Sequence, residues 1–116
     1  MVFLCYPKCS TCQKAQVWLQ AQGIDFTLRN IKEDNPMVEE LRLWQQCSGQ
    51  PLKKFFNTSG MLYKSMNLKE KLPTMTEEEQ LLLLASDGML VKRPLVIQNE
   101  TVLTGFRAGE WEKALL

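Results

Sequence analysis

The sequence predicts one α/β domain over residues 1–116, in the order β-α-β-α, then a helical insertion at about 50–90, then β-β-α. Three observations favour this fold class. A short apolar run at 2–6 opens the chain and is typical of a strand buried on both faces. Apolar residues at helical spacing follow it. Near the end, two short runs of strand-forming residues flank a turn at Asn99 and Glu100, as in a β-hairpin.

The first half of the chain alternates between helix and strand patterns. A helix is expected after Cys9, and Gly23 is a plausible residue to end it. Apolar and polar residues then alternate over 24–29, which predicts a second strand. Strand, helix and strand over this length predict a parallel pair of strands. A second helix is expected to begin at Asn35 and Pro36, with Asn35 as its cap and Pro36 in its first helical position.

The second half is predicted to be helical up to the hairpin. Residues 52–72 combine lysines, two adjacent phenylalanines and a turn-like stretch, which indicates short helices and loops. Thr76 and Glu79 have the spacing of a capping box, so a helix should begin there and end near Gly88. The hairpin leads into a last helix that carries Trp111 on its apolar face.

Composition restricts the classes of function. The chain has 45% apolar and 23% charged residues, which is ordinary for a soluble globular protein. Fourteen basic and thirteen acidic residues leave a formal charge of +1, so no direct binding to nucleic acid or to an anionic membrane is expected. There is no apolar run of membrane-spanning length and no signal-peptide pattern, which predicts a cytoplasmic protein.

The chemistry of the sequence concentrates in the Cys-x-x-Cys motif Cys9-Ser10-Thr11-Cys12, placed between the first strand and the first helix. Two thiols three positions apart on one opening turn lie close enough to bond to each other. Cys9 would lie at the helix N-terminus, where unpaired N–H groups and the helix dipole favour the thiolate. The motif therefore predicts a redox dithiol in which Cys9 attacks and Cys12 resolves.

Two other interpretations of the cysteine pair stay open. A Cys-x-x-Cys is also half of a zinc site. The chain has no His, however, and only Cys5 and Cys47 remain as further cysteine ligands. Cys5 lies in the apolar first strand, where it is typical of a small buried hydrophobe. An inert cysteine pair is the second alternative, because the motif alone is only moderately specific. We expect neither a metal nor a cofactor.

Four features together resemble the arsenate reductase/Spx family over essentially the whole chain. They are the Cys-x-x-Cys motif after the first strand, the helical middle, Arg93-Pro94 before the hairpin, and Gly105-Phe106 before the last helix. The resemblance implies a thioredoxin-like fold with a helical insertion. It also implies a cis bond before Pro94, a nucleophilic Cys9 and an oxyanion-binding Arg93. A guanidinium held near a thiolate would stabilise it and could bind an anion through two hydrogen bonds.

The resemblance implies catalytic roles for Cys9, Cys12 and Arg93, with Ser10, Thr11 and Pro94 as the supporting loop. That set of residues is the predicted site. It contains no cofactor-binding residue and no metal ligand.

Departures from the family pattern bear on function. Gln13 and the stretch 57–59 stand where many relatives carry Arg, which makes true arsenate reduction the less favoured activity. Arg107 is either a second anion contact or a solvated residue at a helix start. The Cys-x-x-Cys resembles the Spx members, which use it as a disulfide switch and bind RNA polymerase to regulate transcription.

Two hypotheses follow, and the sequence leaves open whether the protein is an enzyme. One is a thiol-disulfide oxidoreductase, which would need a thiol reductant such as glutaredoxin, thioredoxin or glutathione. The other is a Spx-like redox-sensing regulator that binds RNA polymerase without turnover. Both hypotheses use the same pair of thiols, so they differ only in whether the protein turns over a substrate and in which partner it binds.

Overall fold

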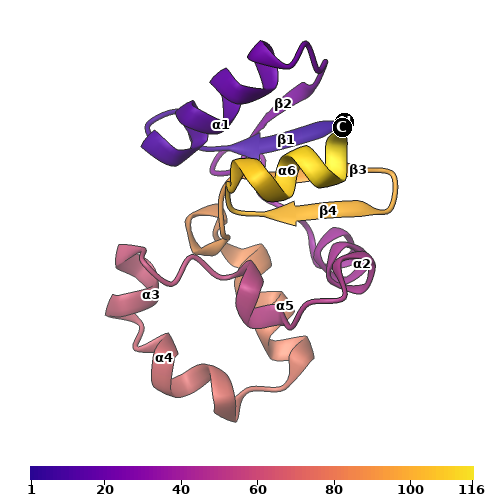
Figure 1. The fold of residues 1–116 in the computed structure, drawn as a ribbon. Coiled ribbons are helices and arrows are strands. Elements are labelled where there is room, and N and C mark those ends of the chain that lie inside the picture. The colour runs from indigo at the N-terminus through magenta and orange to yellow at the C-terminus, as the bar shows by residue number, and fades with distance from the viewer.

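The computed structural model describes all residues from 1 to 116, and it confirms the predicted order of elements (Figure 1). The elements are β1 (Val2–Cys5), α1 (Ser10–Ala21), β2 (Thr27–Asn30), α2 (Val38–Ser48), η1 (Leu52–Phe55), α3 (Met61–Ser65), α4 (Leu68–Lys71), η2 (Leu72–Thr74), α5 (Glu77–Ser86), η3 (Gly88–Leu90), β3 (Leu95–Gln98), β4 (Thr101–Thr104) and α6 (Ala108–Leu115), where η denotes a 3-10 helix. None of these helices combines the length and the apolar character that crossing a membrane would require.

The four strands form one sheet in the order β2-β1-β3-β4. β1 and β2 are parallel, as the strand-helix-strand pattern predicts, whereas β3 is antiparallel to both β1 and β4. Leu4 near the end of β1 therefore pairs with Leu95 at the start of β3. This register brings the loop after β1 and the loop before β3 to the same edge of the sheet. The Cys-x-x-Cys and Arg93 lie in those two loops.

Each face of the sheet is covered by its own apolar cluster. Phe3, Cys5 and Val96 point to the face that α1 and α6 cover, with Trp111 fully enclosed there. Leu4 and Leu95 point to the other face, which is covered by α2, α5 and the short helices between them. Alternation of side chains along a strand produces this division, so β1 is buried on both faces as predicted. Figure 1 shows α3, α4 and α5 gathered beyond the α2 side of the sheet.

Two predicted boundaries are shifted. The second strand begins at Thr27 and ends at Asn30, later than the alternating stretch. Ile24 and Phe26 pack against the α1–α6 cluster, while Leu28 is more than half exposed. β2 lies at an edge of the sheet, so alternation there reflects contact with a neighbouring cluster as well as strand pairing.

The start of α2 also differs from the prediction. Met37, and not Asn35, is the N-terminal cap, and the Glu40 carboxylate accepts a hydrogen bond from the Met37 N–H at 3.0 Å. The Asn35 side chain instead donates to the Ala85 carbonyl at the end of α5. The Asn35 side chain, which the local pattern predicted to cap α2, is therefore used in a tertiary hydrogen bond. The other predicted cap, Thr76 with Glu79, is present as a capping box.

The helical segment between α2 and β3 is tied back to the chain that leads into β3. Phe56 and Val91 form an isolated antiparallel bridge. Around it, the Asn57 N–H donates to the Leu90 carbonyl at 2.8 Å, and the Lys92 N–H donates to the Phe55 carbonyl at 2.7 Å. Since Lys92 directly precedes Arg93, these bonds hold η1 in a fixed position relative to the predicted anion-binding residue.

Candidate functional site

Cys9 lies at the N-terminal cap of α1, as the sequence predicts. Its N–H donates to the Tyr6 carbonyl at 2.9 Å, and its carbonyl accepts from the Gln13 N–H at 3.0 Å. These bonds close the loop between β1 and α1 and leave the side chain half-buried at the mouth of a cavity. The side chain is thus held at the positive end of the helix and stays accessible.

Opposing effects act on the Cys9 thiol, and the net result is a lowered pKa. Partial burial acts to raise the pKa of Cys9. Nearby donor groups, namely the Cys12 N–H, the Arg93 guanidinium, the Cys12 thiol and the Thr11 N–H, act to lower it, and together they outweigh burial. Cys9 is therefore set up as a thiolate nucleophile.

Cys12 occupies a different environment one turn further along α1. Its side chain is 1% exposed, and its sulfur accepts a hydrogen bond from the Tyr6 N–H at 3.3 Å. Burial raises the pKa of Cys12 to about 12, against the lowering effect of that hydrogen bond and with a further increase from the charge of Cys9. Part of this increase depends on the Cys9 thiolate and would disappear once Cys9 is neutral.

Arg93 lies where the resemblance implies, in the loop before β3, and the Arg93-Pro94 bond is cis as predicted. Its guanidinium carbon is 5.2 Å from the centroid of the Tyr6 ring, a cation–π arrangement. One terminal nitrogen is 4.0 Å from the Met89 sulfur. The Arg93 Nε is buried and has no acceptor among the protein atoms. The protein thus leaves part of the donor capacity of this guanidinium unused.

Tyr6 is a site residue that the sequence interpretation missed. Its carbonyl accepts from Cys9, its N–H donates to Cys12, and its ring lies under the Arg93 guanidinium. One residue at the end of β1 thus contacts all three predicted site residues. An aromatic residue between an apolar strand and the Pro7 loop was the only local signal. It identified no partner, because Arg93 is distant in the sequence.

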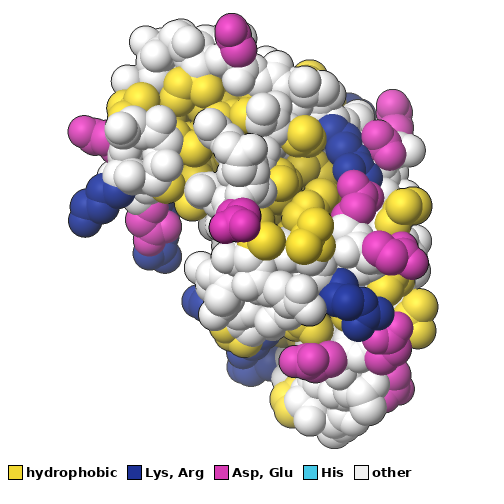
Figure 2. Space-filling model, turned by 90° about the vertical axis from the view of Figure 1, so that its right-hand side faces the viewer, with side chains coloured by type: hydrophobic (Ala, Val, Ile, Leu, Met, Phe, Trp, Pro, Cys, Tyr) yellow, Lys and Arg dark blue, Asp and Glu magenta, His cyan; other side chains and the backbone are white.

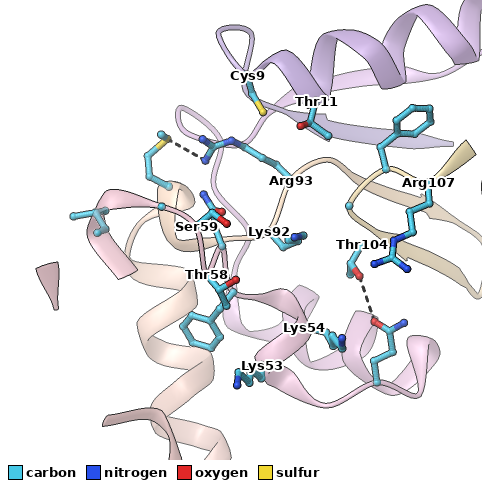
Figure 3. Close-up of a pocket in the computed structure, with 18 of the residues that line it drawn as sticks. Cys9, Thr11, Lys53, Lys54, Thr58, Ser59, Lys92, Arg93, Thr104 and Arg107 are labelled. Carbon is cyan, nitrogen blue, oxygen red and sulfur yellow. Dashed lines mark hydrogen bonds between the residues drawn. The ribbon is translucent and has the colours of Figure 1, made fainter. Parts of the chain in front are cut away.

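Cys9, Thr11 and Arg93 open onto a cavity of about 1120 Å³ (Figure 3). Of the other predicted loop residues, Ser10 is exposed outside this lining, and Pro94 is buried behind it. Arg107 also borders the cavity, but its side chain is 81% exposed and lies 3.6 Å from the Glu110 carboxylate. This arrangement leaves Arg107 solvated and available at the rim.

The positions that depart from the family pattern have defined places. The Gln13 side chain donates to the Pro7 carbonyl at 2.9 Å, so it braces the loop that carries Cys9. Ser59 lines the cavity and offers a hydroxyl in place of a guanidinium. The anion-binding set that the resemblance implies for an arsenate reductase is therefore reduced at both positions.

The other two cysteines lie on opposite faces of the sheet. Cys5 is buried in the α1–α6 cluster, and burial raises its pKa against the effect of a hydrogen bond from Cys12. Cys47 is half-buried on α2 and packs against the other cluster. All four cysteines are free thiols in the structure. No three His, Cys, Asp or Glu side chains converge closely enough to hold a metal ion.

Replacing Arg93 should slow the alkylation of Cys9 at neutral pH. Arg93→Ala removes a hydrogen bond that lowers the pKa of Cys9, so the alkylation rate should rise with pH at a higher midpoint than in the wild type. We expect a rate about tenfold lower at neutral pH, from the loss of one hydrogen bond to a charged group. The alkylation rates of the two proteins should converge at high pH, where Cys9 is a thiolate in both.

Arg42→Ala is the matched control for this measurement. It removes the same charge from α2, outside the cavity. There the Arg42 guanidinium forms a salt bridge of 2.8 Å with the Glu78 carboxylate. Its pH profile should follow that of the wild type. Equal midpoints for Arg93→Ala and the wild type would show that the guanidinium does not act on Cys9.

Two bacterial proteins are similar in sequence over almost the whole chain. The chain is 52% identical over 113 residues to YusI of Bacillus subtilis, covering 97% of this chain and 96% of that protein. It is 30% identical over 110 residues to the regulatory protein MgsR of the same organism, covering 95% and 86%.

Solved structures share the fold. An ArsC-family-related protein of Bacteroides fragilis has a TM-score of 0.95 at 60% identity, covering 97% of this chain and 95% of that one. An arsenate reductase from Vibrio cholerae has a TM-score of 0.84 at 26% identity, covering 99% and 98%. These likenesses confirm the predicted thioredoxin-like fold. Residues 4–114 match the sequence model of the ArsC family, and the chain belongs to that family.

Proposed function

We propose that the protein is a thiol-disulfide redox protein in which Cys9 is the nucleophile and Cys12 the resolving thiol. The observation that carries this proposal is the inequality of the two thiols. Cys9 is accessible at a helix N-terminus with a lowered pKa, whereas Cys12 is buried with a pKa of about 12. Attack and resolution need different properties, and the two environments supply them.

The exchange would proceed in two steps. The Cys9 thiolate attacks one sulfur of a substrate disulfide, and the other sulfur leaves as a thiolate. Cys9 is then neutral, so the charge that helps to raise the pKa of Cys12 is gone. Cys12 loses its proton to the departing thiolate and attacks the Cys9 sulfur, which releases the second substrate thiol. Two electrons have passed to the substrate, and Cys9 and Cys12 are joined. A thiol reductant such as glutaredoxin, thioredoxin or glutathione would restore the dithiol.

Mild oxidation tests the pair directly. Mass spectrometry of the oxidised protein should show the loss of two hydrogens confined to the peptide that holds Cys9 and Cys12. Cys47→Ser should give the same product, because Cys47 packs on the opposite side of the sheet. Cys12→Ser should instead accumulate mixed disulfides at Cys9. A dominant bond to Cys47, or covalent dimers of the wild type, would contradict the proposal.

A redox-sensing regulator is the second candidate, and one comparison favours it. The relative MgsR, which matches 95% of this chain, is described as a regulatory protein. In this candidate the Cys9–Cys12 disulfide would switch a surface that binds RNA polymerase, without turnover. The reduced arginine set at Gln13 and Ser59 also favours thiol exchange or switching over arsenate reduction.

Turnover and partner binding separate the candidates. Arsenate and a model disulfide should be offered to the protein with glutaredoxin or thioredoxin, beside a pull-down on RNA polymerase with oxidised and reduced protein. We expect weak or no arsenate reduction. Multiple turnovers of the disulfide would support the oxidoreductase, and redox-dependent capture of polymerase without turnover would support the regulator. Robust arsenate turnover would contradict the expected weak arsenate reduction and favour an enzyme over the regulator.

A further inference from the structure

The charged side chains that line the cavity at Cys9 are mostly positive. Five cationic side chains border it against the single acid Glu110: Lys53, Lys54, Lys92, Arg93 and Arg107. In the view of Figure 3, Cys9, Thr11 and Arg93 lie at one end and Lys53 and Lys54 at the other, with Lys92, Thr104 and Arg107 between them. In this view the charges are spread between the two ends of the cavity, whereas a site for one small oxyanion would gather them at a point.

The rest of the surface does not share this polarity. The formal charge of the chain is only +1, and acidic and basic side chains lie close together on the face in Figure 2. The concentration of cations in the cavity is therefore a local feature. Single-sign charge in a hollow with low-dielectric walls raises the local concentration of oppositely charged ligands.

The backbone segments that carry these cations are held in place by tertiary contacts. Lys53 and Lys54 lie on η1, which the Phe56–Val91 bridge ties to the segment carrying Lys92 and Arg93. The stem of Lys92 lies against Gly105, where an added Cβ would come within 3.1 Å of the lysine Cε. Across the cavity, the Thr104 hydroxyl is hydrogen-bonded to the Gln50 side chain at 3.3 Å. Because these backbone segments are already ordered, a ligand can bind the cations without the entropic cost of ordering them.

We propose that the cavity docks an extended acidic segment of a partner protein and presents a disulfide of that segment to Cys9. This inference rests on the proposed function. The cavity of about 1120 Å³ exceeds the usual range for small-molecule sites, and 14 of its 20 lining residues are not hydrophobic. An extended chain carries side chains at regular intervals, so several carboxylates can meet these cations while one cysteine reaches Cys9.

Single-stranded nucleic acid is the other polyanion to consider, and the lining does not favour it. Its binding sites add aromatic faces on which bases stack. Phe56 is 1% exposed, and the Phe106 ring packs edge-on against Trp111 at 4.8 Å between centroids. The lining therefore holds one half-buried ring, Phe106, where a row of stacked bases would need several.

The reaction with such a segment balances as a transfer of two electrons. The Cys9 thiolate bonds to the cysteine sulfur of the segment, and the group formerly bonded to that sulfur leaves with the electron pair. Cys12 loses its proton to that leaving group and bonds to Cys9, and the segment departs as a thiolate. The protein dithiol is oxidised to the Cys9–Cys12 disulfide, and the partner disulfide is reduced.

Three synthetic peptides test the inference. Each carries one cysteine as a 2-thiopyridyl disulfide, flanked by Glu, Gln or Lys, and release of pyridine-2-thione reports the reaction with the reduced protein. We expect the Glu peptide to react about tenfold faster than the Gln peptide at low salt, and the Lys peptide to be the slowest. The differences should shrink as salt is added, because the charges involved are solvent-accessible.

Paired variants assign the effect to the cavity. The double variant Lys53→Gln with Lys54→Gln should bring the Glu-to-Gln rate ratio towards one. The double variant Lys69→Gln with Lys71→Gln makes the same charge change on exposed residues of α4, outside this cavity, and should keep the ratio of the wild type. Equal rates for all three peptides, or an equal loss in both double variants, would overturn the inference.

A binding measurement keeps the inference separate from the redox chemistry. Fluorescent versions of the peptides with Ser in place of Cys should bind in the order Glu, Gln, Lys even if exchange fails. Binding of the Glu peptide without exchange would overturn the proposed function and support the docking site. Exchange of the Gln peptide with no preference for the Glu peptide would support the proposed function and overturn the docking site. Displacement of the Glu peptide by oligothymidylate at equal charge concentration would identify a nucleic-acid site and overturn the docking of an acidic segment.

Discussion

Iodoacetamide at neutral pH should alkylate Cys9 first, and Cys9→Ser should abolish the fast phase. Burial raises the pKa of Cys12 to about 12, so at pH 7 its thiolate is far scarcer than that of an ordinary thiol, of which a few per cent is ionised. The pKa of Cys9 is lowered below the ordinary value, and its side chain borders the cavity. The rate at Cys9 should therefore exceed the rate at Cys12 by at least about tenfold.

Peptide mapping after limited alkylation measures this difference. Cys47→Ser should retain the fast phase, since Cys47 packs in the cluster on the opposite face of the sheet. Cys12→Ser should retain it as well, while losing the ability to form the disulfide under mild oxidation. If Cys12 or Cys47 is labelled before Cys9, the assignment of nucleophile and resolving thiol is wrong.

Gly88→Ala should destabilise the fold by about 3 kcal/mol, at the upper end of the cost of overpacking a core. Gly88 is buried at the start of η3, and a Cβ there would overlap the Ile31 carbonyl and lie 3.1 Å from the Lys32 Cα. These contacts are backbone atoms, which cannot rotate away as a side chain could. The melting temperature should fall by about 10 °C for a domain of this size.

Gly109→Ala is the matched control for Gly88→Ala. Gly109 lies in α6, and an added Cβ would have no atom within 4 Å. Alanine is the better helix former, so the control should match the wild type or gain up to about 1 kcal/mol. A melting temperature for Gly88→Ala equal to that of the control would mean that the loop after β2 does not pack on η3 as the structure has it.

Sequence patterns predicted the fold wherever the signal is local. The apolar run of β1, the capping box at Thr76 and the turn at Asn99 each specify an element from a few adjacent residues. They failed where a distant residue intervenes. Asn35 has the chemistry of a cap, but the carbonyl of Ala85, fifty residues away, takes its side chain. Local propensity is a weak prior that tertiary contacts override.

By itself, the sequence determined the pair of thiols, the helix start that activates Cys9, and the family resemblance that singles out Arg93. The first two features depend on residue type and spacing over one turn of helix, and the resemblance depends on motifs distributed along the whole chain. Only the tertiary structure decided that Cys12 is buried, that Tyr6 contacts Cys9, Cys12 and Arg93, and that Lys53 and Lys54 face the same cavity as Cys9. Burial, solvent exposure and charge density are properties of neighbours in space. Here those neighbours come from β1, η1 and the loop before β3, which only the folded sheet brings together.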